Sequence, residues 1–312
     1  MQVHRNIEDL PPFRKAVVTI GTFDGVHRGH QQIIRLLKAE ATANGGETVI
    51  ITFHPHPRKV ISGRKEGVLL INTLDEKIRL LGDLGINHLV VVPFTPEFSS
   101  LTAGEYIRDF LVSKFHPEVL IIGYDHRFGQ GRKGDYQLLE EMGPVYGFDV
   151  KEIPEHVLNT VTISSTHIRN SLMEGKLAEA NQFLGYPFPL SGTVVEGDKR
   201  GRTIGFPTAN LVAFDPEKLI PADGVYAVTL QVGARKNLYR GMMNIGFRPT
   251  VGGDKRSLEV HILNFSEEIY GSVLSLKFHH YVRKEMKFPS LEALKSQLAA
   301  DKEEVEKLLA DL

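Results

Sequence analysis

Short apolar runs alternate with segments of helical periodicity between residues 15 and 153, and this pattern constrains the fold more than any other feature. The apolar runs have the length and β-branched content of buried strands. Such alternation favours parallel strands joined by right-handed helical crossovers, with ligands binding beyond the carboxyl ends of the strands. We therefore expect a doubly wound α/β sheet. The expected strands are residues 15–20, 47–53, 88–94, 118–124 and 148–153, and the expected helices are residues 31–43, 74–84, 103–115 and 136–142.

A different pattern follows the two further helical segments 164–174 and 176–184. Prolines and glycines interrupt the chain at 185–192, and only strand patterns separated by turn residues come after them. We place the domain boundary here, with domains 1–185 and 186–312. The pattern predicts an all-β barrel or sandwich. Its expected strands are residues 192–197, 224–232, 238–246, 257–265 and 272–282.

The end of the chain has the signals of one further helix. Pro289 and a Ser290 N-cap precede about 22 residues of helical periodicity. We expect this terminal helix to pack on the β domain.

Composition excludes several classes of protein. Cysteine is absent from the 312 residues, so neither a disulfide framework nor a thiolate metal site can form. Near-equal numbers of basic (37) and acidic (38) side chains are not typical of a protein that coats nucleic acid. The polar N-terminus and the lack of a membrane-length apolar run argue against secretion and insertion. We expect a cytoplasmic protein with neither nucleic acid nor membrane as partner; oligomeric state, including a transient homo-oligomer, stays open.

The segment GTFDGVHRGH, residues 21–30, follows the first predicted strand and opens the first helix. Helix N-termini at this position present backbone amides to phosphate groups. His27 and His30 share a helix face, and Gly29 allows a ligand to approach the backbone. The spacing matches neither GxGxxG nor the Walker sequence, which disfavours a hydride enzyme or a P-loop kinase. The alternative is an ordinary helix cap with two surface histidines.

This HxGH segment resembles the signature of the HIGH-type nucleotidylyltransferase superfamily. A second element of that superfamily, ISSTxxR, is present at residues 163–169. The resemblance implies attack of a substrate phosphate oxygen on the α-phosphorus of ATP, with His27 and His30 stabilising the transferring phosphate. The ATP-binding residues that it implies are Gly21, Phe23, Asp24, Gly29, Ser164, Ser165, Thr166 and Arg169.

Two more segments of the first domain resemble the bacterial bifunctional riboflavin kinase and FAD synthetase family. TFHPHP, residues 52–57, is similar to an element that lines the flavin pocket in that family; this implies flavin contacts from Phe53, His56 and Pro57. The alternative is a zinc pair of His54 and His56, which lacks further ligands at a suitable spacing.

The segment GYDHRFG, residues 123–129, resembles a loop that lies near ATP in the same family. Asp125 would accept a ribose hydroxyl and Arg127 would face phosphate. The alternative is a basic surface loop.

In the second domain, residues 194–210 combine glycines with cations, as phosphate-binding loops do. A basic hairpin that contacts RNA is the alternative. The PTAN sequence at 207–210 resembles riboflavin kinases, in which its Thr and Asn hold Mg²⁺ and ATP phosphates; this implies Thr208 and Asn210 as metal ligands. The ATP-binding residues that the resemblance implies are Gly197, Lys199, Arg200, Gly201, Gly205, Pro207 and Thr208.

Three other segments of the second domain also resemble the kinase family. SLEVHILNF places the catalytic glutamate at Glu259, the base that would deprotonate the ribityl hydroxyl. NIGFRPT and YVRKEMKF imply flavin contacts from Asn244 and Arg283. The alternative for Glu259 is an outward-pointing strand residue, as most glutamates are.

The resemblance covers the chain from about residue 15 to the terminal helix. It implies a Rossmann-like nucleotidylyltransferase domain with a parallel sheet, followed by an antiparallel β-barrel riboflavin kinase domain. The expected function is phosphorylation of riboflavin to FMN and adenylylation of FMN to FAD and pyrophosphate, with ATP as co-substrate and Mg²⁺ as cofactor. The alternatives are a chain that retains one activity, its other domain being a flavin-binding scaffold, and a nucleic-acid adaptor.

Overall fold

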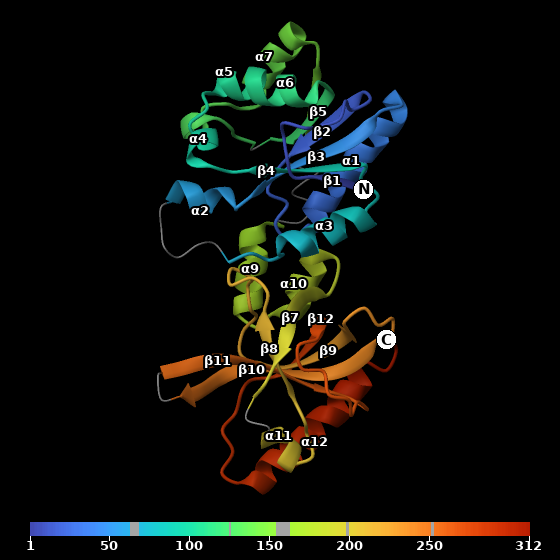
Figure 1. Ribbon diagram of the computed structural model, residues 1–312, viewed down its shortest axis with the longest axis vertical. Helices are drawn as coiled ribbons and strands as arrows, with labels where there is room; N and C mark the ends of the chain where they lie inside the picture. The colour runs from blue at the N-terminus through green and yellow to red at the C-terminus, as the bar shows by residue number, and fades with distance from the viewer. Residues whose placement is uncertain (63–68, 125, 154–162, 198–199, 251–252) are drawn as a thin grey trace. The chain divides into compact units, whose positions relative to one another are not determined.

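The computed structural model describes residues 1–62, 69–124, 126–153, 163–197, 200–250 and 253–312. The chain divides into two compact units, Met1–Ser165 and Thr166–Leu312. Figure 1 shows the first unit in blue to green and the second in yellow-green to red. The expected domain boundary at 185/186 stays a prediction.

The first unit contains a six-stranded sheet in the order β1-β4-β3-β2-β5-β6, and every pair of neighbours is parallel. The predicted parallel α/β sheet is confirmed. One strand, β1, was not predicted, because three residues with one apolar side chain give no periodic signal. The strands are β1 (Gln2–His4), β2 (Ala16–Ile20), β3 (Glu47–His54), β4 (His88–Pro93), β5 (Pro117–Gly123) and β6 (Asp149–Ile153).

Helices cover both faces of this sheet (Figure 1). Alternate strand residues, such as Val17 and Val18, point to opposite faces, as the pleat requires. One face packs on α1 (Arg28–Asn44) and α3 (Leu74–Asp83). The other packs on a continuous helical run over 103–115, which includes a π-helix, η1 (Tyr106–Val112). The remaining helices of the described part are α2 (Pro57–Ser62), α4 (Pro96–Ser99), α5 (Ala103–Glu105), α6 (Ser113–Phe115), η2 (Gln130–Arg132) and α7 (Tyr136–Tyr146).

The second unit is a closed barrel in the order β10-β11-β8-β7-β12-β9, with antiparallel neighbours. The pattern alone left barrel or sandwich open, and the barrel that the resemblance implied is confirmed. Aromatic rings of Tyr226, Phe278 and Phe188 meet in its buried core. The strands are β7 (Phe188–Val195), β8 (Ala209–Ala213), β9 (Gly224–Val232), β10 (Tyr239–Thr250), β11 (Gly253–Ile262) and β12 (Val273–Arg283).

Helices complete the second unit. The terminal helix α12 (Leu291–Leu308) begins where the sequence predicts, because the Ser290 hydroxyl accepts a hydrogen bond from the Ala293 N–H (3.1 Å). It packs on β9, β10 and β12. The other helices are α9 (Ser165–Met173), α10 (Leu177–Leu184) and α11 (Arg200–Thr203). Within the described residues, no helix has the length and apolar character needed to cross a bilayer.

Candidate active sites

The first candidate site lies where the strand order of the parallel sheet reverses. β2 has β3 on one side and β5 on the other, so the segments that follow these three strands emerge at one edge. This switch point is the usual ligand crevice of an open α/β sheet. The HxGH, FHPHP and GYDHRFG segments follow β2, β3 and β5 respectively, so the topology gathers at one edge three motifs that are far apart in the sequence.

The two histidines form a stacked pair at the start of α1. His27 is the N-cap residue, and its Nδ1 accepts a hydrogen bond from the His30 N–H (3.4 Å). The ring centroids are 3.7 Å apart, with 19° between the planes. A Cβ at Gly29 would lie 3.2 Å from the His27 ring, so glycine leaves room for this arrangement. His27 thus caps the helix, as the alternative interpretation expected. It is only 6% exposed, however, so it is not a surface residue.

His30 is neutral at physiological pH. Burial, followed by the electrostatic influence of the neighbouring His27 and Lys77, holds the pKa of His30 well below its ordinary value. Its Nδ1 is buried and has no hydrogen-bond partner among the described residues. A neutral imidazole with an unused ring nitrogen can donate to a phosphate oxygen that enters the site.

The turn between β2 and α1 is tightly held. Phe23 and Val26 both have positive φ (47° and 36°), which is unusual for residues with a Cβ. Asp24 is buried, and its carboxylate accepts hydrogen bonds from the N–H groups of Ile71 (3.0 Å) and Asn72 (3.2 Å). Asp24 thus fastens the turn to the segment that leads into α3, and its expected contact with ATP stays a prediction.

The second superfamily motif lies against the first. The Ser165 hydroxyl donates a hydrogen bond to the Asp24 carbonyl (2.8 Å), and a Cβ at Gly29 would be 4.0 Å from the Ile163 carbonyl oxygen. The ISST segment and the HxGH turn therefore meet, although about 140 residues separate them. Thr166 and Arg169 fall in the second unit, and their roles toward ATP stay predictions.

A buried lysine beside this turn was missed by the sequence analysis. Lys77, from α3, is 7% exposed, and its ammonium group donates to the Thr22 carbonyl (2.6 Å). Burial lowers the pKa of Lys77 to about 8, and the nearby Asp24 carboxylate opposes this shift. The helical pattern of 74–84 gave no signal for it, because lysines are normally exposed.

The predicted flavin residues lie at the end of β3. Phe53 contacts the rings of Phe94 (5.4 Å between centroids) and Phe98 (5.7 Å). His56 Nδ1 accepts a hydrogen bond from the Arg58 N–H (3.2 Å), and Pro57 begins α2. These residues form an aromatic and proline-rich wall at the sheet edge.

The loop after β5 is only partly described. Asp125 lies outside the described residues. Arg127 is exposed, and its guanidinium donates a hydrogen bond to the His126 carbonyl (3.1 Å). Phe128 is buried against Tyr106. Arg127 is thus accessible to a phosphate, but no contact within the described protein fixes it toward one.

The second candidate site is built on one cross-strand row of the barrel. Asn210 of β8 is opposite Glu259 of β11, and Glu259 is opposite Asn244 of β10. The row continues through Val225 of β9 to Arg283 of β12. Directly opposed residues point to the same face, so four predicted site residues share the barrel face on which α12 packs.

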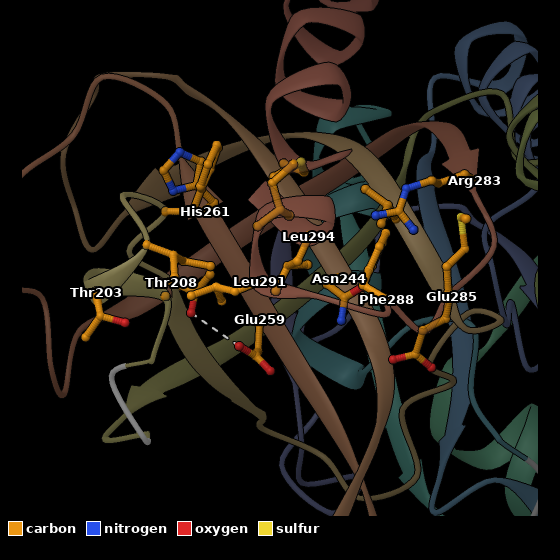
Figure 2. Close-up of a pocket in the computed structure, with 17 residues that line it drawn as sticks. Thr203, Thr208, Asn244, Glu259, His261, Arg283, Glu285, Phe288, Leu291 and Leu294 are labelled. Carbon is orange, nitrogen blue, oxygen red and sulfur yellow. Dashed lines mark hydrogen bonds between the residues drawn. The ribbon is translucent and has the colours of Figure 1, made fainter. Parts of the chain in front are cut away.

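A cavity of about 580 Å³ lies along this row (Figure 2). Glu259, Asn244 and Arg283 line it on the barrel side, and Leu291, Leu294 and Leu298 of α12 line it on the other. A few polar groups in a mostly apolar cleft suit an aromatic ligand with a hydrophilic chain.

The PTAN segment approaches Glu259 at one end of the cavity. The Thr208 hydroxyl donates to the Glu259 carboxylate (3.2 Å; Figure 2), so Glu259 points into the site rather than away from it. His261 Nδ1 contacts the Pro207 carbonyl (2.8 Å) and fixes the start of the motif; burial lowers the pKa of His261. Sequence analysis missed this residue.

Glycines bring the cation-rich loop close to PTAN. A Cβ at Gly197 would lie 2.1 Å from the Asn210 amide nitrogen, and one at Gly201 would lie 2.2 Å from the Phe206 carbonyl oxygen. Gly205 has a φ of 86°. Lys199 lies outside the described residues, and the Arg200 side chain is not described. The positions of these three glycines are consistent with the predicted phosphate-binding loop, because each is at a close approach or a backbone conformation that favours glycine.

At the other end of the cavity, Arg283 forms a forked ion pair that the sequence did not indicate. Its Nε and Nη2 donate to the Asp301 carboxylate at 2.6–3.0 Å, and its Nη1 donates to the Lys284 carbonyl (3.0 Å). Asp301 is on α12 and is 2% exposed. Arg283 thus ties β12 to α12 while lining the cavity, and its contact with flavin stays a prediction.

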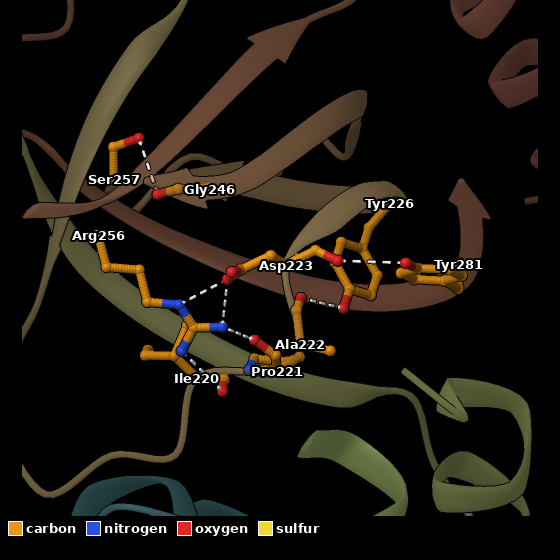
Figure 3. Close-up of polar contacts among 9 residues, drawn as sticks. All are labelled: Ile220, Pro221, Ala222, Asp223, Tyr226, Gly246, Arg256, Ser257 and Tyr281. Atoms are coloured by element: carbon orange, nitrogen blue, oxygen red, sulfur yellow. Dashed lines mark hydrogen bonds and ion pairs between the residues drawn. The ribbon is translucent and has the colours of Figure 1, made fainter. Parts of the chain in front are cut away.

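A second arginine anchors the loop before β9 (Figure 3). Arg256 donates to the Asp223 carboxylate (2.8 Å) and to the carbonyls of Ile220 (3.3 Å) and Pro221, and the Tyr281 hydroxyl donates to the Asp223 carbonyl (3.1 Å). These bonds fix the loop immediately before Val225, so they help to set the cross-strand row.

Comparisons with known proteins agree with both sites. The FAD synthetase family model matches residues 11–167, and the riboflavin kinase family model matches residues 184–309. The bifunctional riboflavin kinase/FMN adenylyltransferase of Escherichia coli K12 is 40% identical over 96% of each chain. This chain belongs to that bifunctional family. The Listeria monocytogenes member is also 40% identical, over 95% of this chain and 93% of its own.

A solved structure supports the fold of this family member over its whole length. The crystal structure titled as a macrolide-efflux protein from Streptococcus pneumoniae matches with a TM-score of 0.86, 33% identity and 98% coverage of both chains. Its title names efflux, whereas both family models and the curated relatives name flavin chemistry.

Proposed function

We propose that this chain makes FAD from riboflavin in two ATP-dependent steps. The barrel unit phosphorylates riboflavin to FMN, and the α/β unit transfers AMP from ATP to FMN and releases pyrophosphate. The observation that carries the proposal is that each of two independent motif sets gathers at one site, in a chain that resembles bifunctional enzymes over 96% of its length. We place the enzyme in the cytoplasm, with riboflavin, FMN and ATP as its partners.

In the kinase step, Glu259 acts as the general base. The terminal ribityl hydroxyl of riboflavin loses its proton to the carboxylate as its oxygen attacks the γ-phosphorus, and ADP leaves. The hydrogen bond from Thr208 (3.2 Å) orients the carboxylate. The mostly apolar cavity between the barrel and α12 holds the flavin ring, with Asn244 and Arg283 at its wall.

The kinase residues fit Mg²⁺. Thr208 and Asn210 offer hydroxyl and amide oxygens beside the Glu259 carboxylate, and oxygen donors are what this hard cation prefers. Thr208 and Asn210 would hold the ion, which would neutralise charge on the ATP phosphates.

In the adenylylation step, an FMN phosphate oxygen attacks the α-phosphorus of ATP and pyrophosphate departs. The main requirement of this step is that the site stabilises the negative charge on the transferring phosphate, which hydrogen-bond donors held in position can do. The unused Nδ1 of neutral His30 and the N-terminal amides of α1 are such donors. His27 orients His30 by stacking and by capping the helix.

A chromatographic time course with riboflavin, ATP and Mg²⁺ tests the proposal. Wild type should accumulate FMN before FAD. The double variant His27→Ala with His30→Ala should stop at FMN. Glu259→Gln should make neither product from riboflavin but should still convert added FMN. Glu304→Gln, which changes an exposed glutamate of α12, is the matched control and should behave as wild type.

The rival functions give different outcomes. A chain with one activity would stop at FMN, or would make FAD only from added FMN. Failure to phosphorylate or adenylylate any flavin would contradict the enzymatic proposal.

A further inference from the structure

Lys77 is a buried charged group of the α/β unit that belongs to none of the motifs. It comes from α3, yet its ammonium group reaches the β2–α1 turn and donates to the Thr22 carbonyl at 2.6 Å. The Thr52 hydroxyl from β3 donates to the same oxygen at 3.1 Å. Donors from two elements, α3 and β3, therefore converge on one carbonyl that lies five residues before His27.

The carbonyl belongs to a turn that is conformationally costly. Positive φ at Phe23 and Val26 is unfavourable for residues that have a Cβ, and it persists only where the surroundings enforce it. Lys77 holds one side of the turn, and the N–H groups of Ile71 and Asn72 hold the other through Asp24. Burying an ammonium group costs free energy. A lysine is therefore unfavourable at this position unless its charge has a role.

The charged and titratable groups around Lys77 come from the β2–α1 turn, from α1 and from α3 itself. Asp24 of the turn attracts its charge, whereas His30 of α1, stacked on His27, is made harder to protonate by it. The carboxylate of Glu76, on the same helix as Lys77, accepts a hydrogen bond from the Thr73 N–H (2.9 Å). The positive charge of the ammonium adds to burial and to His27 in favouring the neutral form of His30, and it attracts phosphate.

We propose that Lys77 is a positioning residue of the adenylyl-transfer site: its charged form holds the Thr22 carbonyl, and with it the turn that places His27 and His30. This rests on the proposed adenylylation of FMN. Its consequence is a charge requirement in one of the two reactions of the chain and not in the other.

The pH dependence of FAD formation tests this role. Because the pKa of Lys77 is about 8, the ammonium is charged below pH 8 and loses its proton as the pH rises. FAD formation from added FMN should fall above pH 8, to about a tenth of its plateau rate at one pH unit above the pKa. FMN formation from riboflavin by the same protein should not show this fall.

Two variants of Lys77 and one control separate charge from structure. Lys77→Arg keeps a cation that does not titrate in this range, so it should retain activity and remove the alkaline fall. Lys77→Met should lower kcat for FAD formation at pH 7 at least tenfold and give a flat profile. Lys38→Met removes an exposed lysine that donates to the Leu84 carbonyl (2.7 Å), and it should keep the wild-type profile.

The outcomes are distinguishable. Wild-type kcat in Lys77→Met, or an unchanged alkaline fall in Lys77→Arg, would overturn the role of Lys77 while leaving the proposed function intact. If Lys77→Met does not fold, the profile of Lys77→Arg decides by itself. A wild-type chain that makes no FAD at any pH would overturn the proposed function and this role with it.

Discussion

The ion pair of Arg283 and Asp301 predicts a large loss of stability when either partner is replaced alone, and recovery of that stability when both are replaced. Asp301→Leu removes a carboxylate that accepts three hydrogen bonds from Arg283 at 2.6–3.0 Å and one from the Gln297 amide (2.9 Å), and it leaves the arginine without its ion-pair partner. Removing one member of a buried pair costs about 3–5 kcal/mol, mainly because the other charge stays buried without its partner. The Arg283 side chain is 17% exposed, which places the cost at the lower end, about 3 kcal/mol.

The reverse change should cost more. Arg283→Met leaves the Asp301 carboxylate with the Gln297 hydrogen bond (2.9 Å) but without a compensating positive charge, and because this side chain is only 2% exposed, its charge loses more hydration. The double variant, Arg283→Met with Asp301→Leu, leaves no buried charge. We expect it to be within about 1 kcal/mol of wild type, because apolar replacement of a buried pair is often nearly neutral.

Hydrogen exchange followed by mass spectrometry is the suitable assay. The chain has no tryptophan and two compact units, so a single optical transition would not isolate the barrel. Peptides from β12 and α12 report the contact directly. A loss of 3 kcal/mol corresponds to exchange faster by about two orders of magnitude. Additive losses in the double variant would refute the reasoning, because they would mean that the cost does not come from a stranded charge.

Four further changes test other parts of the two sites. Thr73→Ala removes the capping box with Glu76 at the start of α3, and should cost about 1 kcal/mol in the hydrogen-exchange stability of that helix. Gly197→Ala pushes on the Asn210 amide and should lower kinase kcat about tenfold, with FAD formation from FMN unchanged. His261→Leu removes the contact with the Pro207 carbonyl and should raise the KM for ATP of the kinase about fivefold, a cost of about 1 kcal/mol. Removing Mg²⁺ with a chelator should abolish FMN formation, and Mg²⁺, but not Na⁺, should restore it.

Local patterns predicted the elements that have strong periodicity, but not those defined by tertiary pairing. The alternating segments of 15–153 and the terminal helix were correctly predicted, because burial on one or both faces determines their periodicity. β8 was missed, since its residues 209–213 overlap a motif rich in turn-forming and polar residues. The π-helix in 106–112 was likewise not separable from an α-helix by spacing alone.

The candidate sites show a similar division. His27, His30, Thr208 and Glu259 belong to motifs, so their grouping was predictable, and the structure brings each pair together. Lys77 and Asp301 lie on helices where a charged residue normally faces water, and only the packed structure reveals that they are buried. The general lesson is that motifs identify groups that contact ligands, whereas residues that hold those groups in place are found through burial.

The cross-strand row of the barrel restricts where the length of this protein can change. Asn210 and Glu259 are fixed opposite each other by backbone pairing, and side chains alternate between the two faces of a strand. Inserting one residue into β11 just before Glu259 would turn the glutamate toward the apolar interior of the barrel. The fully exposed turn 233–238 has no such restriction. Insertions and deletions among natural variants should therefore collect in that turn and be absent from β8 and β11.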